Sequence, residues 1–271
     1  MRFTTAFRPL RLNSEFRAVE ANLRESFRVL APGRPRAEVL ELPGLSIASL
    51  GVTFQMFNAA FLSTPVAGPD ELRDRLIAAR RFFTGTGQQW SFWICEDWLD
   101  RPARRNADRV LRSHGLRLAS EVPGMIAGEI EPLRRAPVHM EFRRVACART
   151  LADFAGIGTV CFNVPAPWYC EVFDASLPER RFVAWVGYVD GCPVATAASV
   201  TAEGIVGLYN VATEPGRRGQ GLAEATTRHA ITQAREEVPD APVVLQSSSM
   251  GMNLYARLGF RAVTRFRVYN S

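Results

Sequence analysis

The sequence predicts an α/β protein of the α+β type, with a mixed sheet, built from two similar halves. Apolar runs with helical spacing alternate along the chain with short β-prone runs. Each half ends in the same order: a helix, a glycine (Gly115 or Gly259) and a strand. Residues 54–81 also parallel residues 205–234 as strand, proline-containing turn and helix. The offset of roughly 145 to 150 residues indicates an internal duplication.

In the first half, apolar periodicity predicts three helices, and turn residues separate the predicted strands. We expect the helices over residues 13–30, 70–83 and 104–113, the second of them capped by Asp70. We expect the strands over residues 38–42, 45–50, 52–57 and 90–95, with one or two more within residues 116–130.

A linker is predicted at residues 131–138, which carry two prolines, several charges and little that could pack. It divides the chain into a domain of residues 1–130 and a domain of residues 139–271. In the second domain we expect helices over residues 150–161, 222–237 and 250–258. The expected strands are residues 140–145, 181–189, 192–200, 204–211, 243–246 and 261–269, and residues 165–174 form a segment rich in proline and aromatics.

The composition is that of an ordinary globular protein, with 47% apolar and 22% charged residues. No apolar run approaches the ~18 residues of a membrane span, and Met1 to Phe7 lack the apolar core of a signal peptide. The five cysteines are odd in number and form no Cys-x-x-Cys pair, and the three histidines are scattered. We therefore expect a cytoplasmic protein with no membrane partner and no metal site.

The formal charge is +6, and all 33 basic residues are arginine. An arginine surplus is one property of nucleic-acid-binding proteins. However, no basic cluster is interleaved with aromatic residues, so we favour a bias towards arginine and expect no nucleic-acid partner.

The most informative stretch runs from Gly207 to Glu224, where a β-prone run enters a basic, glycine-rich turn and a helix follows at once. Glycines allow the backbone to approach a ligand closely. The first amides of a helix have no partner within the helix, and the helix dipole favours negative charge there. Two arginines, Arg217 and Arg218, add charge suited to phosphate. The stretch therefore predicts a phosphate-binding site.

The two common phosphate motifs do not fit this turn. A Walker A loop requires a lysine, and the chain contains none. A dinucleotide fingerprint requires a third glycine where Glu224 stands. Instead, Arg218-x-x-Gly221-x-Ala223 resembles the Gln/Arg-x-x-Gly-x-Gly/Ala pyrophosphate signature of the GNAT superfamily of N-acetyltransferases.

A second stretch resembles the same family. Residues 253–260 read Asn-Leu-Tyr-Ala-Arg-Leu-Gly-Phe, similar to the Tyr-x-x-x-Gly-Phe helix end of GNAT proteins. Tyr255 lies on an apolar helical face, and Gly259 is suited to end the helix. The resemblance covers about residues 140–271. It implies tandem GNAT-like domains, each with a central, mostly antiparallel sheet flanked by helices.

The resemblance also implies an activity, the transfer of an acetyl group from acetyl-CoA to an amine by direct attack in a ternary complex. Tyr255 would be the general acid for the thiolate, and its ordinary pKa near 10 keeps it protonated at neutral pH. Backbone groups of the preceding strand would pair with the pantetheine arm, and the turn would hold the pyrophosphate. The implied donor-binding residues are Val211, Ala212, Thr213, Arg218, Gly219, Gln220, Gly221, Leu222, Ala223 and Glu224.

Two features depart from the family pattern. Ser248 stands where some members have an asparagine that bonds the donor, so it is either a donor contact or a simple loop serine. No general base is evident, because the available carboxylates, Glu171, Glu203 and Glu214, are each better explained as solvated surface charges. Trp168, Tyr169 and Tyr209 are candidates for the acceptor site, with core packing as the alternative. The acceptor would be a small-molecule or peptide amine.

The first copy lacks these features. Its turn, residues 64–71, has no arginine and places Asp70 and Glu71 where a pyrophosphate requires positive charge. Leu111 stands at the position that corresponds to Tyr255. We therefore expect a degenerate domain that packs against the second and walls its substrate cleft. A non-catalytic, CoA-responsive binding module is the alternative function, because the base is missing.

Overall fold

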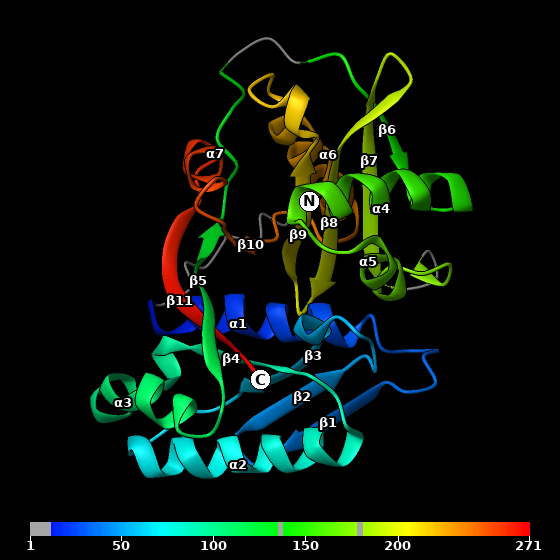
Figure 1. Cartoon of the computed structure of the whole chain (residues 1–271). Helices are drawn as coiled ribbons and strands as arrows, with labels where there is room; N and C mark the ends of the chain where they lie inside the picture. The colour runs from blue at the N-terminus through cyan, green and yellow to red at the C-terminus, as the bar shows by residue number, and fades with distance from the viewer. Residues whose placement is uncertain (1–11, 135–137, 178–180) are drawn as a thin grey trace.

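The computed structural model describes residues 12–134, 138–177 and 181–271 (Figure 1). Two predictions concern residues outside these ranges: residues 1–7, for which no signal peptide is expected, and the centre of the predicted linker. The helices are α1 (Leu12–Arg28), α2 (Gly68–Thr86), α3 (Arg101–Arg112), α4 (Ala148–Phe162), α5 (Ala166–Val172), α6 (Leu222–Glu237) and α7 (Met252–Arg257). The strands are β1 (Glu38–Leu42), β2 (Leu45–Ser49), β3 (Asn58–Leu62), β4 (Ser91–Cys95), β5 (Arg117–Ala127), β6 (Glu141–Arg144), β7 (Phe182–Val189), β8 (Cys192–Ala202), β9 (Ile205–Thr213), β10 (Val243–Gln246) and β11 (Arg261–Asn270).

All these strands belong to one mixed sheet of eleven strands, in the order β1-β2-β3-β4-β11-β5-β10-β9-β8-β7-β6. The pairs β3–β4 and β9–β10 are parallel, and the other neighbours are antiparallel. The predicted mixed, mostly antiparallel α+β class is therefore confirmed. The two halves share this single sheet, whereas the sequence pattern suggested one sheet for each.

The sheet is continuous because the halves exchange their last strands (Figure 1). Strand β5, which ends the first half, lies between β10 and β11 of the second half. Strand β11, which ends the chain, lies between β4 and β5 of the first half. Each half thus requires a strand of the other to complete its hydrogen bonding.

The duplication expected from the sequence is visible in the order of elements. The series β1, β2, β3, α2, β4, α3, β5 of the first half is matched by β7, β8, β9, α6, β10, α7, β11 of the second. Helices α1 and α4 precede the two series.

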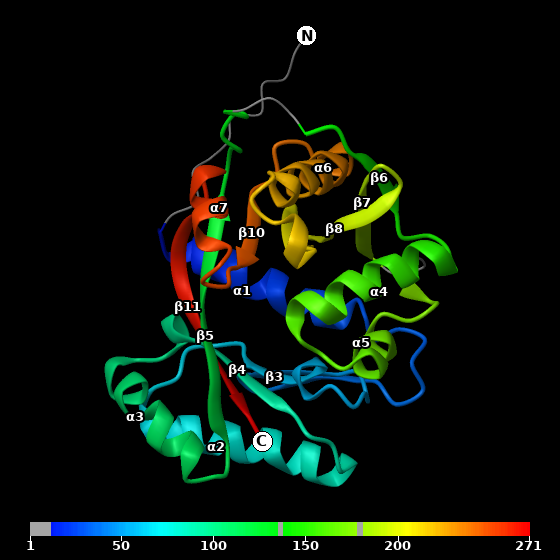
Figure 2. The same ribbon diagram turned by 45° about the horizontal axis from the view of Figure 1, so that its top comes forward.

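Helices cover both faces of the second half (Figure 2). Successive side chains of a strand point to opposite faces. Val243 and Leu245 of β10 pack in one cluster with α6 and α7, whereas Val244 between them packs with α1. On β8, Ala198 and Val200 join the cluster of α4 and α5. Helices α6 and α7 therefore cover one face, and α1, α4 and α5 cover the other. None of the helices in the described ranges is long and apolar enough to cross a membrane.

Two local predictions are wrong. Residues 52–57 form a turn with a 3₁₀ segment (Gln55–Phe57), and the strand follows as β3. The buried Asn58 holds this turn, because its side-chain amide donates to Val52 O (2.7 Å) and to Gln89 O (3.0 Å). Helix α2 begins at Gly68, before the predicted cap, and Asp70 pairs with Arg73 within the helix.

Candidate active site

The site is built where β9 separates from its parallel neighbour β10. The paired residues end at Leu208 and Leu245, although β9 continues to Thr213. Asn210 has a φ of 50°, and the register with β8 shifts at this point, which is the geometry of a β-bulge. Residues 211–213, the predicted pantetheine contacts, therefore follow the bulge on a strand edge that β10 no longer pairs with.

The turn after β9 brings backbone amides to the N-terminus of α6, a helix of 16 residues. Gly219 and Gly221 have φ angles of 79° and 82°, in the left-handed region that favours glycine. Among the described residues, no acceptor is recorded for the amides of residues 219–224. Six adjacent donors at the positive end of a helix dipole form a site for an anion.

Polar side chains around this turn also lack partners within the described chain. The Thr213 hydroxyl and the Arg217 Nε are buried without a hydrogen bond. The exposed Arg218 turns back, and its Nε donates to Thr213 O (3.3 Å). A ligand carrying phosphate oxygens fits these groups, because it would satisfy orphaned donors that are costly to leave unpaired.

Tyr255 lies on α7 and is only 7% exposed. Its ring packs edge-on against Phe260 (centroids 5.7 Å apart) and lies over Gly251, where a Cβ would come within 2.8 Å of it. Burial raises the pKa of the Tyr255 phenol above its ordinary value. The ring belongs to the same apolar cluster as Leu208 of β9 and Leu245 of β10, the last residues that pair between these two strands.

The remaining predicted residues have mixed positions. Ser248 is exposed, and its hydroxyl accepts a hydrogen bond from the amide of Gly251 (3.3 Å), at the start of α7. Tyr169 is buried in the core, and its hydroxyl accepts from Asn210 Nδ2 (2.8 Å). Tyr209 donates to Asn22 Oδ1 of α1 (2.7 Å). Trp168 is 39% exposed on α5. Of the three aromatic candidates, only Trp168 presents substantial surface to a ligand.

The carboxylates considered as bases lie in different places. Glu203 lies in the turn between β8 and β9, at the opposite end of β9 from Thr213. Glu171 accepts a hydrogen bond from the amide of Thr53 (2.8 Å). Glu214 directly follows β9 and is the one of the three that adjoins the turn.

The equivalent position of the first half is filled by protein. The Glu71 carboxylate accepts a hydrogen bond from the Ala67 amide (2.7 Å) at the N-terminus of α2 and pairs with Arg75. The hydrogen bond from Ala67 lowers the pKa of Glu71. An anion could not enter without displacing this carboxylate.

Three residues that the structure brings to the site were not among the implied donor-binding residues. Cys161, at the end of α4, donates through Sγ to Thr213 O (3.2 Å). Asn210 forms the bulge and orients Tyr169. Arg217 adds the orphaned guanidinium nitrogen described above. Of these three residues, only Arg217 could be found from the sequence, because it stands next to Arg218 of the motif.

Comparisons with known proteins concern the family of the second half and the fold of the whole chain. Residues 149–260 match the model of the acetyltransferase (GNAT) family. The fold is similar to that of a GCN5-related N-acetyltransferase from Kribbella flavida, with a TM-score of 0.69, 22% identity and 95% of each chain covered. It is also similar to a GCN5-related N-acetyltransferase from Sphaerobacter thermophilus, with a TM-score of 0.52, 16% identity and 97% of this chain and 94% of that chain covered.

A third similar structure is a tandem GNAT protein from the clavulanic acid biosynthesis pathway, with a TM-score of 0.55, 11% identity and 97% of both chains covered. No curated protein matches the chain in sequence. The tandem architecture follows from the repeated series of elements and from this similarity over nearly the whole chain. The second half thus carries a region that matches the acetyltransferase (GNAT) family, and the fold of the whole chain is similar to that of a tandem GNAT protein.

Proposed function

We propose that the second half is an N-acetyltransferase that moves an acetyl group from acetyl-CoA to an amine by direct attack in a ternary complex. The observation that carries this proposal is the set of unpartnered amides from Gly219 to Glu224 at the start of α6. Together with Arg217 and Arg218 they suit a pyrophosphate, which carries negative charge and several acceptor oxygens.

The open edge of β9 suits the rest of the donor. Residues 211–213 offer backbone groups beyond the last pair with β10, so an amide-containing pantetheine arm could bond there like a neighbouring strand. The thioester would then lie near the separation of the strands, beside the ring of Tyr255. A backbone amide of β9 would stabilise the charge that develops on the thioester oxygen.

In the reaction, the amine nitrogen forms a bond to the thioester carbon and the carbon–sulfur bond breaks. Tyr255 would donate its proton to the departing thiolate and recover one from solvent. Because burial raises its pKa, Tyr255 stays protonated throughout the physiological range. The same burial makes Tyr255 a weaker acid. Proton transfer to the thiolate is therefore favourable only if the thiolate is also poorly solvated, because this raises the pKa of the thiol.

No side chain is assigned as the general base that takes the proton released by the amine. Glu214 adjoins the donor site, whereas Glu171 is bound to the first half and Glu203 lies at the far end of β9. We propose that the acceptor amine reacts in its neutral form, which is a fraction of the amine in solution, and that the proton released after the attack passes to water. The first half would not bind acyl-CoA, because Glu71 fills the start of α2.

Calorimetry with CoA tests the donor site. We expect Arg218→Glu to weaken binding by about 10- to 100-fold, since it replaces a favourable charge with a repulsive one. Arg81→Glu, which reverses an exposed charge on α2, is the matched control and should leave CoA binding unchanged. Equal CoA affinity in both variants would contradict the site.

A non-catalytic, CoA-responsive module is the second candidate, and the burial of Tyr255 favours it. Acetyl transfer to a panel of amines, followed by mass spectrometry of the products, distinguishes the two. CoA binding without any acetylated product would favour the module.

A further inference from the structure

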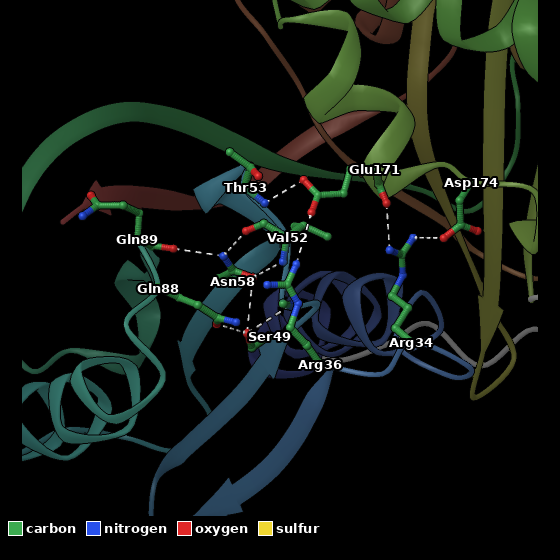
Figure 3. Close-up of polar contacts among 11 residues, drawn as sticks. Arg34, Arg36, Ser49, Val52, Thr53, Asn58, Gln88, Gln89, Glu171 and Asp174 are labelled. Carbon is green, nitrogen blue, oxygen red and sulfur yellow. Dashed lines mark hydrogen bonds and ion pairs between the residues drawn. The ribbon is translucent and has the colours of Figure 1, made fainter.

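Helix α5 of the second half is held by a loop of the first half (Figure 3). Arg34, which follows α1, donates from Nη1 to Glu171 O (2.7 Å) and from Nη2 to Val172 O, at the C-terminal end of α5. It also pairs with Asp174 (2.9 Å) and donates from Nε to Leu30 O (2.9 Å). The Arg34 side chain is 8% exposed. A buried guanidinium with these partners fixes the end of α5 relative to the first half.

A second contact fixes the side chains of the same helix. The Glu171 carboxylate accepts a hydrogen bond from the Thr53 amide (2.8 Å) and lies 3.8 Å from Arg36. Thr53 belongs to the turn that the buried Asn58 holds in place (Figure 3). Glu171, in the last turn of α5, and Asp174, just after this helix, therefore both interact with groups of the first half.

An aromatic pair also joins the halves. Phe54, in the turn of the first half, lies 6.2 Å from the ring of Trp168 on α5. Phe54 also packs against Phe57, which contacts Phe173 beyond α5. Trp168 is 39% exposed and Phe54 is half-buried, so part of this aromatic pair is accessible to a ligand.

The same aromatic row leads to the donor strand. Phe173 contacts Tyr169, whose ring stacks on Phe162 (6.4 Å, 12°) at the end of α4. Phe162 is 44% exposed, and its neighbour Cys161 bonds to Thr213 O. The rings of Phe54, Trp168 and Phe162 are thus connected through the buried rings of Phe173 and Tyr169. Phe162 follows Cys161, which contacts the end of β9, the strand along which the donor is proposed to bind.

We propose that this surface, formed by Phe54, Phe162 and Trp168, binds the acceptor, and that the acceptor is an amine carrying an aromatic or similarly apolar group. The inference rests on the proposed acetyl transfer and adds its substrate class and the role of the first half. Arg34 is a positioning residue, which acts by holding α5.

Charge supports this class over a polycationic acceptor. Several ammonium groups would require several unpaired carboxylates, whereas Glu171 bonds to Thr53 and Asp174 pairs with Arg34, and Glu214 beside Cys161 is a single carboxylate. An aromatic group instead removes apolar surface from water and stacks on exposed rings.

Steady-state acetylation of 2-phenylethylamine and of 1,4-diaminobutane tests the proposal. We expect kcat/KM to favour 2-phenylethylamine by at least about tenfold. Phe54→Ala and Trp168→Ala should each raise its KM by about tenfold, with little change in kcat or in the Kd of CoA. Leu118→Ala, at an exposed apolar residue of β5, is the control and should change neither. Equal use of the two amines, or an unchanged KM in both aromatic variants, would overturn the proposal.

Arg34→Ala tests the positioning role, with a raised KM for 2-phenylethylamine and an unchanged Kd for CoA as the expected result. Arg34→Lys, which keeps the charge but not the planar fork, should restore part of the loss. An Arg34→Ala protein that remains folded and keeps the native KM would overturn this role.

A failure of acetyl transfer itself is distinguishable from a failure of this inference. Ligand-observed NMR with 2-phenylethylamine and the CoA-loaded protein measures acceptor binding directly. Binding that is lost in Trp168→Ala supports the surface even without turnover, and absence of binding to the unaltered protein overturns it.

Discussion

Replacing Tyr255 with phenylalanine tests the proposed role of its hydroxyl as an acid while the packing of the ring is kept. The ring would keep its contacts with Phe260 and Gly251, because only the hydroxyl is removed. No hydrogen-bond partner is recorded for this hydroxyl among the described residues, so the free energy of unfolding should change little. Loss of a positioned general acid typically lowers a rate by 10²- to 10⁴-fold, or by about 2.7 to 5.4 kcal/mol of transition-state stabilisation.

The assay is single-turnover acetylation with saturating acetyl-CoA, monitored by mass spectrometry of the product so that the five cysteines do not interfere. We expect a fall in rate within this range, an unchanged Kd for CoA and an unchanged Tm. Tyr269→Phe, which removes a hydroxyl from a buried tyrosine of β11, is the matched control and should keep the full rate. A Tyr255→Phe protein that reacts at the native rate would refute the assignment of the acid.

Three further predictions concern the loop, the turn of the first half and a histidine of α6. Gly221→Ala forces a Cβ onto a residue with φ of 82°, so it should destabilise the fold by about 1–2 kcal/mol and weaken CoA binding, as calorimetry and urea unfolding would show. Asn58→Ala leaves Val52 O and Gln89 O unpaired and should cost about 2–4 kcal/mol in urea unfolding; a loss below 0.5 kcal/mol would contradict the role of this amide. Burial lowers the pKa of His229 below 6.5, so the folded state favours the neutral ring and loses stability as pH falls below this value. The unfolding free energy of His229→Gln should therefore decline less between pH 7.5 and 5.5, and an identical decline would refute the linkage.

The strand, turn and helix of the proposed donor site were predictable from the sequence because their causes are local. Helix α6 begins and ends at the predicted residues, Leu222 and Glu237. Gly219 and Gly221 have the positive φ angles that an anion-binding turn uses, and this follows from residue type and spacing. The element order of both halves follows from apolar periodicity and turn residues in the same way.

Nonlocal pairing was decided only by the tertiary structure. Nothing within β5 or β11 specifies that each completes the other half, because any two strands with compatible faces can pair. The strand predicted over residues 52–57 was wrong because Asn58 bonds to groups from two different segments, which outweighs a local β preference. The contacts of Arg34 with α5 and of Phe54 with Trp168 join residues more than a hundred positions apart, and no local pattern encodes such distances. The sequence thus determined the glycine-rich turn and the helices, whereas the shared sheet and the proposed acceptor surface depend on how the two halves pack together.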